Sequence, residues 1–418
     1  MQPLNKLSHC TYLVTVLFWA GRRERVVTAS RSPYGNGAVM NQKSVLISGA
    51  SVAGPALALW LHRYGFRATL VERAPALRDG GHAIDFRGAG LDVLKRMGLF
   101  EAVREHDTAM KGMTVVNGAG ETVATLPAEF MSGELEVLRG DLTRVLYEAT
   151  RDDAEYVFGD SIASIVQSED AVHVEFEKGE PRTFDLVVGA DGAHSNVRRL
   201  VFGPESEYAH DLGLRSAVFR APNYLDLDHR GVLCRLGDKA AMIFSARGNT
   251  EALAGFFCTA PSVDVDRNDI AAQKRFLAER FAGEGWEIPR LLDIMETADD
   301  FFFDGINQIR MDTWSRGRVV LLGDAAYCAA PTSGMGTSQA LVGAYVLAGE
   351  LATAAGDHKT AFAAFEKEMH DYVAQNQLLG RSLAESFFPS GGEAADGPGL
   401  HAMDEAPVPT MELKGYQV

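Results

Sequence analysis

Cysteine is scarce in this sequence. The 418 residues include four cysteines, which lie far apart at Cys10, Cys234, Cys258 and Cys328. They form no C-x-x-C pair and no cluster with histidine at metal-site spacing, which excludes a disulfide scaffold and a zinc module. Scattered reduced thiols are typical of cytoplasmic proteins. The sequence therefore predicts a cytoplasmic protein that holds no metal.

Basic charge and long apolar runs are also in short supply. Lys and Arg number 40 against 56 Asp and Glu, which gives a net charge of −16. Nucleic-acid phosphates require a basic surface, so a nucleic-acid partner is excluded. No apolar run reaches the ~18 residues of an integral membrane span. The longest run near the start, residues 12–20, is followed by Arg22, Arg23 and Arg25, the wrong charge order for a secretion signal.

The start of the chain is read as an extension. A β-strand is predicted directly after Met40, so we interpret Met40 as the natural start. Residues 1–39 are then a disordered extension or a mis-assigned start, and a targeting segment is the less favoured alternative. The rest of the chain is long enough for two domains and, with 46% hydrophobic residues, for a sizeable core.

A β-α-β unit opens this remaining part. The stretch VLISGASVAGPALALWL, residues 45–61, runs from an apolar segment through a glycine turn into helical spacing. It predicts a strand over 44–48 and a helix over 52–64, and a second strand follows over 68–72. A unit of about 30 residues is the context that a dinucleotide-binding turn requires.

The glycine turn nearly matches the G-x-G-x-x-G fingerprint. Gly49 and Gly54 occupy the first and third glycine positions, and Ser51 replaces the middle glycine. Taken alone, this match is weak, and an ordinary strand–helix turn is an equal alternative. Glu72 ends the second strand, where a carboxylate can accept hydrogen bonds from the ribose hydroxyls of a nucleotide. The same carboxylate would repel a 2'-phosphate, so the predicted nucleotide is FAD or NAD and not NADP. The predicted nucleotide contacts are Gly49, Ser51, Val52, Ala53, Gly54, Glu72 and Arg73.

Two later segments repeat the pattern of a strand that enters an acidic-glycine turn. DLVVGADGAHSNVR spans residues 185–198, and RGRVVLLGDAAYCAAPTSGMG spans residues 316–336. Between them, residues 214–259 alternate as short strands, and residues 113–126 read as a hairpin. Three strand-type runs are expected over 156–188.

These patterns predict an α/β fold. A Rossmann-like FAD-binding domain is assembled from separated segments, with an inserted antiparallel-sheet substrate domain and C-terminal helices. The predicted parts are 40–112, 139–206 and 312–356 for the FAD-binding domain, 113–138 and 207–311 for the substrate domain, 357–388 for a C-terminal helix, and 389–418 for a mobile tail.

With all three turns present in order, residues 42–379 resemble the group A flavoprotein monooxygenases, the para-hydroxybenzoate hydroxylase superfamily. RDGGHAID, residues 78–85, is similar to a stretch of its tetracycline-inactivating members. The resemblance implies that Asp324 binds the ribityl and pyrophosphate part of FAD, and that the loop 331–336 packs beside the isoalloxazine. The site residues that it implies are Arg78, Asp85, Arg139, Asp191, Gly192, Gly323, Asp324, Pro331, Gly334, Met335 and Gly336.

The resemblance also implies the chemistry. In this family NADPH or NADH binds transiently and reduces FAD. O2 then adds to the reduced flavin to give a C4a-hydroperoxide. This species delivers one oxygen atom to an aromatic or polyketide-type small molecule, including antibiotics. A reductase or dehydrogenase without oxygen insertion is the alternative, and a flavin-holding binding protein is a third reading. The expected assembly is a monomer or a homodimer.

No catalytic residue is fixed by spacing. The candidates for a base are His82, Arg215, Arg235 and Arg247, and for each a structural role is favoured. Two positions depart from the family pattern besides Ser51. Tyr327 stands where many relatives have His, and Gly343 stands where Asp is common.

Overall fold

The computed structural model describes residues 42–78, 80–128, 133–261, 265–387 and 408–417. The predicted extension 1–39 and the start at Met40 lie outside these residues. The described residues belong to one compact unit. The predicted division into an FAD-binding domain and a substrate domain stays a prediction.

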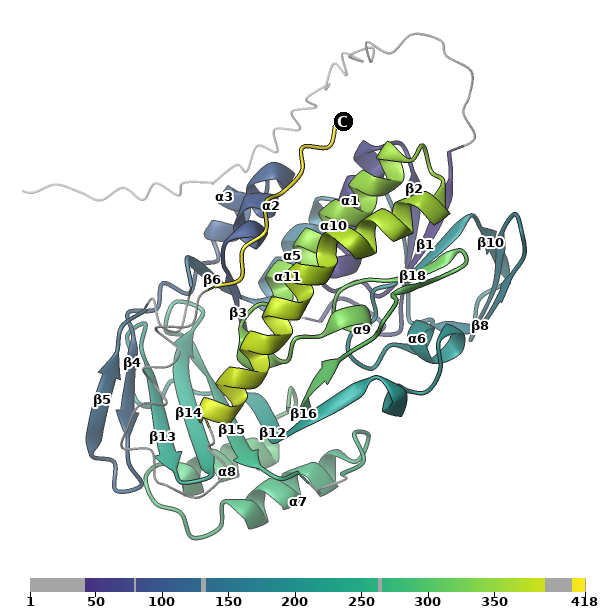
Figure 1. Cartoon of the computed structure of the whole chain (residues 1–418). Coiled ribbons are helices and arrows are strands. Elements are labelled where there is room, and N and C mark those ends of the chain that lie inside the picture. The colour runs from purple at the N-terminus through teal and green to yellow at the C-terminus, as the bar shows by residue number, and fades with distance from the viewer. Residues whose placement is uncertain (1–41, 79, 129–132, 262–264, 388–407, 418) are drawn as a thin grey trace, which may run out of the picture. The chain divides into compact units, whose positions relative to one another are not determined.

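A six-stranded, mainly parallel sheet forms one half of the described structure (Figure 1). Five of its strands are parallel. Four of these five carry near-continuous buried apolar runs, as is typical of parallel strands, and the fifth, at the edge of the sheet, is partly exposed. The strands predicted at 44–48 and 68–72, and the strand predicted at the start of the segment 316–336, are all present in this sheet. The strand order is β17 (Ser315–Arg316), β18 (Val319–Leu321), β11 (Leu186–Gly189), β1 (Ser44–Ser48), β2 (Arg67–Glu72) and β7 (Glu155–Phe158).

Helices cover this sheet. The predicted helix after the glycine turn is α1 (Ala53–Arg63), and its residues 53–61 are all buried, because it lies between the sheet and α10 (Gly336–Thr353). Other helices of this half are α2 (Ala89–Met97), α3 (Phe100–Arg104), α5 (Arg139–Glu148), α6 (Asn196–Val201) and α9 (Asp324–Tyr327). The Rossmann-like α/β architecture is therefore as predicted.

A seven-stranded, mainly antiparallel sheet forms the other half. Its order is β16 (Phe302–Ile309), β12 (Ala209–Ala221), β15 (Glu251–Thr259), β14 (Lys239–Ala246), β13 (Gly231–Leu236), β4 (Met113–Val116) and β5 (Thr122–Leu126). The hairpin over 113–126 is the pair β4–β5. β12 is longer than the predicted short strands, and its pairing with β16 shifts register between Asp211 and Arg215.

Two helices, α7 (Ile270–Arg280) and α8 (Ile288–Thr297), pack on one face of this sheet through an apolar cluster. Trp286 is partly buried and packs against that cluster.

Two smaller sheets complete the fold. β8 (Ile162–Gln167), β9 (Val172–Phe176) and β10 (Arg182–Phe184) form one of them. The span 156–188 thus holds parts of five strands where three runs were expected, because breaks as short as the single residue Asp185 separate them. The other small sheet pairs β3 (Ala83–Phe86) with β6 (Leu135–Leu138).

The long helix α11 (His358–Phe387) packs along α10 and against the loop that contains η2 (Pro331–Ser333), as Figure 1 shows. The prediction of a mobile tail over 389–418 is wrong for residues 408–417. The Tyr416 ring lies where a Gly349 side chain would stand, and the Lys414 ammonium pairs with Glu350 at 2.9 Å and Glu368 at 2.7 Å. Residues 389–407 lie outside the described part.

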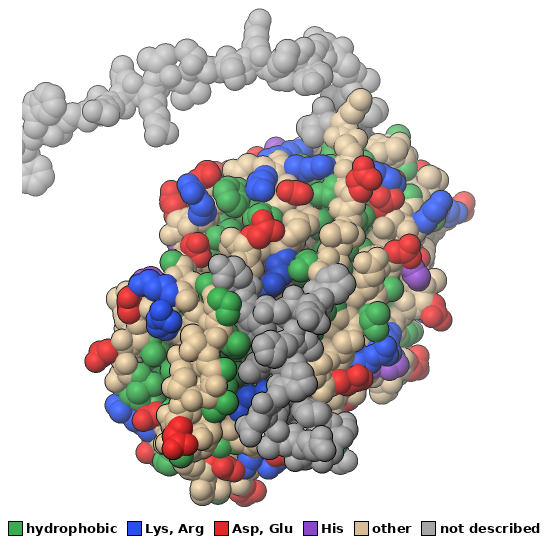
Figure 2. Space-filling view, turned by 60° about the vertical axis from the view of Figure 1, so that its left-hand side comes forward, with side chains coloured by type: hydrophobic (Ala, Val, Ile, Leu, Met, Phe, Trp, Pro, Cys, Tyr) green, Lys and Arg blue, Asp and Glu red, His purple; other side chains and the backbone are tan. Residues whose placement is uncertain are grey.

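The described surface mixes both signs of charge. On the face in Figure 2, acidic and basic side chains alternate without a continuous basic area among the described residues. No helix in the described ranges has the length and apolarity that crossing a bilayer requires. Those ranges also hold no group of three His, Cys, Asp or Glu side chains arranged to bind a metal ion.

Candidate functional site

The three glycine turns meet at the carboxyl ends of the parallel strands. Gly49 has φ +106°, and a Cβ there would stand 2.4 Å from the carbonyl oxygen of Ala190. A Cβ on Gly323 would stand 3.4 Å from the Ala53 side chain. Segments far apart in the sequence therefore touch around the start of α1, as a single bound dinucleotide requires.

Gly54 lets α1 start very close to the turn that follows β1, because glycine has no side chain. A Cβ at Gly54 would lie 2.0 Å from the carbonyl oxygen of Gly49, closer than any real contact. Ser51 is half-buried, so its side chain is accommodated in the turn. The sequence departs from the fingerprint at Ser51, and the structure leaves room for that side chain.

We expect Gly54→Ala to lose most bound flavin and to destabilise the fold by roughly 3 kcal/mol, because backbone must move to admit the methyl group. Absorbance of the purified protein and thermal unfolding measure the two effects. Ser51→Gly is the matched control and should keep flavin and melting temperature. Full flavin occupancy in Gly54→Ala would show that this turn does not hold the nucleotide.

The N-terminus of α1 is open to an anion. Its N-cap residue, Val52, makes no side-chain capping bond, and the first turn carries no acidic residue. The free N–H groups and the positive end of the helix dipole therefore suit a phosphate.

Glu72 stands beside this helix start at the end of β2. Its carboxylate accepts hydrogen bonds from the Ala50 N–H at 3.0 Å and the Ala74 N–H at 2.9 Å. These bonds fix the carboxylate and leave lone pairs for ribose hydroxyls. Arg73, the next residue, is exposed.

Asp324 and Arg139 lie close enough for their charges to interact. Asp324 begins α9 and its side chain is exposed, although the surrounding protein raises the pKa of its carboxyl group. Arg139 begins α5. Burial is the main cause of the lowered pKa of the Arg139 guanidinium. The charge of Arg78 lowers this pKa further, whereas the charges of Asp324 and Glu72 raise it. A Cβ on Gly336 would lie 3.8 Å from an Asp324 oxygen, so the carboxylate adjoins the start of α10.

Asp191 holds its own turn. Its carboxylate accepts hydrogen bonds from the N–H groups of Asn196 at 2.9 Å and Val197 at 3.1 Å, and from the Ser195 hydroxyl. These bonds secure the start of α6. Gly192 follows with φ +82° and open space where a Cβ would stand. The two residues lie at the convergence, and the Asp191 carboxylate is committed to the turn.

The segment 78–85 also reaches the site. Asp85, on β3, lies within 3.6 Å of the position that a Cβ on Gly334 would take. Arg78 is exposed and lies close enough to Arg139 to interact with its charge. The loop itself is well packed, since Met335 is buried, and Pro331 begins its 3₁₀ turn.

The four candidate bases have different partners. His82 lies beside Arg139, and burial together with that arginine lowers the pKa of His82 to about 4, so its imidazole is neutral. Arg215 pairs with Asp211 at 2.9 Å, and Arg247 pairs with Glu251 at 2.7 Å. Arg247 also pairs with Asp141 on α5, two residues after Arg139, at 3.3 Å. Arg235 is half-buried on β13.

Sequence reasoning missed Glu136. It is 7% exposed on β6 and stands opposite Asp85 in the strand pairing. The available signal was a lone acidic residue in the otherwise apolar strand LEVL, which is uncommon unless the carboxyl group has a partner.

The seven-stranded sheet supplies apolar surface beside this site. Ala330, just before the 331–336 loop, packs in a cluster with Met113, Leu214 and Ile306 from three strands of that sheet. Leu138, next to Arg139, packs with Phe244 on β14. An apolar wall of this kind excludes water from a bound reactive group.

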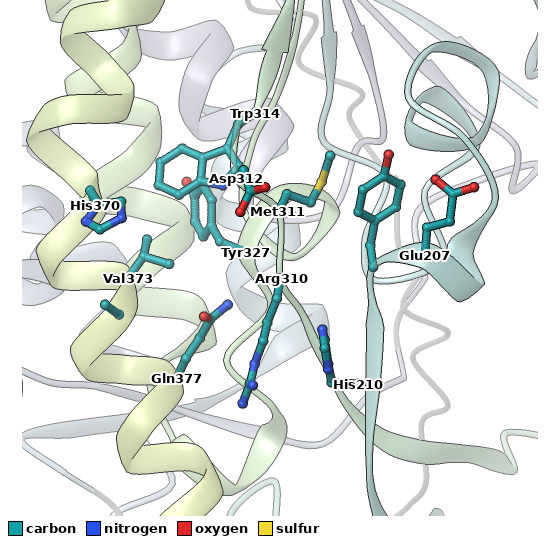
Figure 3. Close-up of a pocket in the computed structure, with 12 residues that line it drawn as sticks. Glu207, His210, Arg310, Met311, Asp312, Trp314, Tyr327, His370, Val373 and Gln377 are labelled. Carbon is teal, nitrogen blue, oxygen red and sulfur yellow. The ribbon is translucent and has the colours of Figure 1, made fainter.

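A separate hollow of about 360 Å³ lies between β12, β16 and α11 (Figure 3). The side chains around it include His210, Arg310, Asp312, Trp314, Tyr327 and His370. None of the predicted flavin contacts lines it. The candidate site is therefore the convergence of the glycine turns.

Comparison with known proteins gives consistent results. A family model described as an FAD binding domain matches residues 42–376. An uncharacterized protein of Mycobacterium tuberculosis H37Rv, Rv1260, is 48% identical over 343 residues, which cover 81% of this chain and 92% of that protein. A flavin-dependent monooxygenase of an unknown prokaryotic organism is 43% identical over 349 residues, with 82% and 90% covered. The solved structure of tetracycline destructase Tet(55) matches with TM-score 0.81 and 40% identity, over 90% of this chain and 99% of that one.

Proposed function

Since this chain belongs to the FAD-binding-domain family and is an FAD-dependent monooxygenase, we propose that it oxygenates a fused-ring aromatic or polyketide-type compound, including tetracycline-like antibiotics. One relative is a tetracycline destructase, which supports an antibiotic substrate. The observation that carries the proposal is the meeting of the three glycine turns at Gly49, Ala190 and Gly323.

The residues of the site fit FAD. We assign Glu72 to the adenosine ribose, the N-terminus of α1 to the pyrophosphate, and Asp324 to the ribityl and pyrophosphate region. The loop 331–336 and Arg139 would border the isoalloxazine. When bound, FAD supplies the electron transfer and the activation of O2. The chain's own residues bind and orient it, and the neighbouring apolar wall keeps water away.

We propose NADPH as the reductant. The sequence has no second glycine fingerprint for a nicotinamide nucleotide, which favours transient binding. Arg78, exposed near Arg139, is a suitable partner for the 2'-phosphate that distinguishes NADPH from NADH. A cytoplasmic location is also a proposal, supported by the free thiols of Cys234, Cys258 and Cys328. We leave the assembly as monomer or homodimer.

The test is an oxygen-incorporation assay. The FAD-loaded protein is given NADPH and a panel of phenols, anthraquinones, tetracyclines and rifamycins, under air and under labelled O2. We expect one compound class to stimulate NADPH oxidation and to gain one oxygen atom that carries the label.

Anaerobic incubation is the control and should leave the substrate unchanged. A product that forms equally well without O2 would favour the alternative, a reductase or dehydrogenase on the same fold. NADPH oxidation that no compound stimulates would contradict the proposed substrate class.

A further inference from the structure

Two acidic side chains lie directly opposite each other in the two-stranded sheet β3–β6. Asp85 and Glu136 are register partners, so their side chains project to the same face of this antiparallel pair. Glu136 is 7% exposed, and the Asp85 side chain is 15% exposed. Two buried carboxylates so close together repel each other, and the arrangement is stable when they share one proton.

The surroundings decide where that proton resides. Burial raises the pKa of both carboxyl groups, and the charge of Asp85 raises the pKa of Glu136 further. Arg87 donates a hydrogen bond to Asp85 at 3.2 Å and favours its ionised form. Asp107 adds negative charge near Glu136, while the Thr108 hydroxyl donates a hydrogen bond to a Glu136 oxygen. The proton therefore resides mainly on Glu136, which donates it toward Asp85.

The pair connects two environments. On one side, Thr108 is half-buried between the exposed residues Asp107 and Ala109, so its hydroxyl lies near solvent. On the other side, Asp85 lies within 3.6 Å of the Cβ position of Gly334, in the loop assigned to the flavin. The order from solvent to the site is Thr108, Glu136, Asp85 and the loop.

We propose that Asp85 and Glu136 share one proton and pass it between solvent and the flavin side of the loop 331–336. This inference rests on the proposed function. Oxygenation of a substrate R–H consumes one proton in R–H + O2 + NADPH + H⁺ → R–OH + NADP⁺ + H2O. The acid gives its proton to the site, and the pair, left with one extra negative charge, is reprotonated from solvent past Thr108.

The first test needs no turnover. Infrared difference spectra of the FAD-loaded protein at pH 7, wild type minus Glu136→Gln, should show the C=O band of a protonated carboxylic acid, which bleaches as the pH is raised. Glu134→Gln, an exposed position two residues away, is the matched control and should keep the band. Asp85→Asn provides a second route if Glu136→Gln does not fold, and it should shift the band's titration to lower pH, because the repelling charge is removed.

The second test is the pH profile of substrate-stimulated NADPH oxidation. We expect Glu136→Gln to lower kcat about 100-fold at pH values below the one at which the acid band bleaches, with KM little changed. Above that pH the wild type loses its proton donor and should fall toward the variant, and the control should follow the wild type. A wild type without the acid band, or an identical band and pH profile in Glu136→Gln, would overturn the inference. If no substrate is oxygenated, the proposed function fails, and the infrared result still decides whether the pair holds a proton.

Discussion

Asp324→Ala is expected to yield protein that has lost most of its flavin. Asp324 is exposed, stands in the third glycine turn and interacts with the charge of Arg139, so it is available to bind polar groups of the ligand. Losing charge-assisted hydrogen bonds worth about 2–3 kcal/mol would weaken FAD binding roughly 30- to 150-fold. The measurement is the ratio of visible to protein absorbance, followed by a fluorescence titration with added FAD.

Asp170→Ala is the control for this variant. Asp170 is an exposed acidic residue in the turn between β8 and β9, so its removal changes net charge equally without touching the site. It should retain wild-type flavin content. If Asp324→Ala retains it as well, the assignment of the third turn to the flavin is wrong.

Gly343→Asp is expected to destabilise the fold by roughly 3 kcal/mol or more. A Cβ at Gly343 would lie 2.1 Å from the Tyr327 hydroxyl oxygen and 2.9 Å from a Leu322 methyl group, and the new carboxylate would be buried. The two positions are thus coupled in the structure, because the Tyr327 hydroxyl fills the space that Gly343 leaves. Chemical unfolding of Gly343→Asp measures the cost.

The double variant Tyr327→His, Gly343→Asp removes the tyrosine hydroxyl that occupies the space beside residue 343. It should be more stable than the sum of the single variants predicts, with a coupling energy of about 1–3 kcal/mol in a double-mutant cycle. Additive effects would mean that the two positions are independent.

The local fold could be predicted from the sequence where one segment alone determines it. The turn at Gly49 and Gly54, the buried strand 44–48 and the helix after it follow from glycine spacing and apolar runs, and each is present. The order of the three glycine turns also predicted their meeting, because carboxyl ends of parallel strands share one edge of a sheet.

Features that depend on distant partners could not be predicted in this way. The strand LEVL shows an acidic residue at Glu136 but not its register opposite Asp85. The turn-rich composition before residue 408 suggested a mobile end, whereas Tyr416 and Lys414 find partners on α10 and α11. Tyr327 and Gly343 are separated along the chain, and their contact appears when α9 and α10 are packed.

The most direct test of the central claim is the visible spectrum of the purified protein, before and after incubation with FAD. Our account predicts a yellow preparation, or a colourless one that takes up about one FAD per chain and then keeps it through desalting. A folded, colourless protein that retains no FAD would contradict the assignment of the site and the proposed chemistry together.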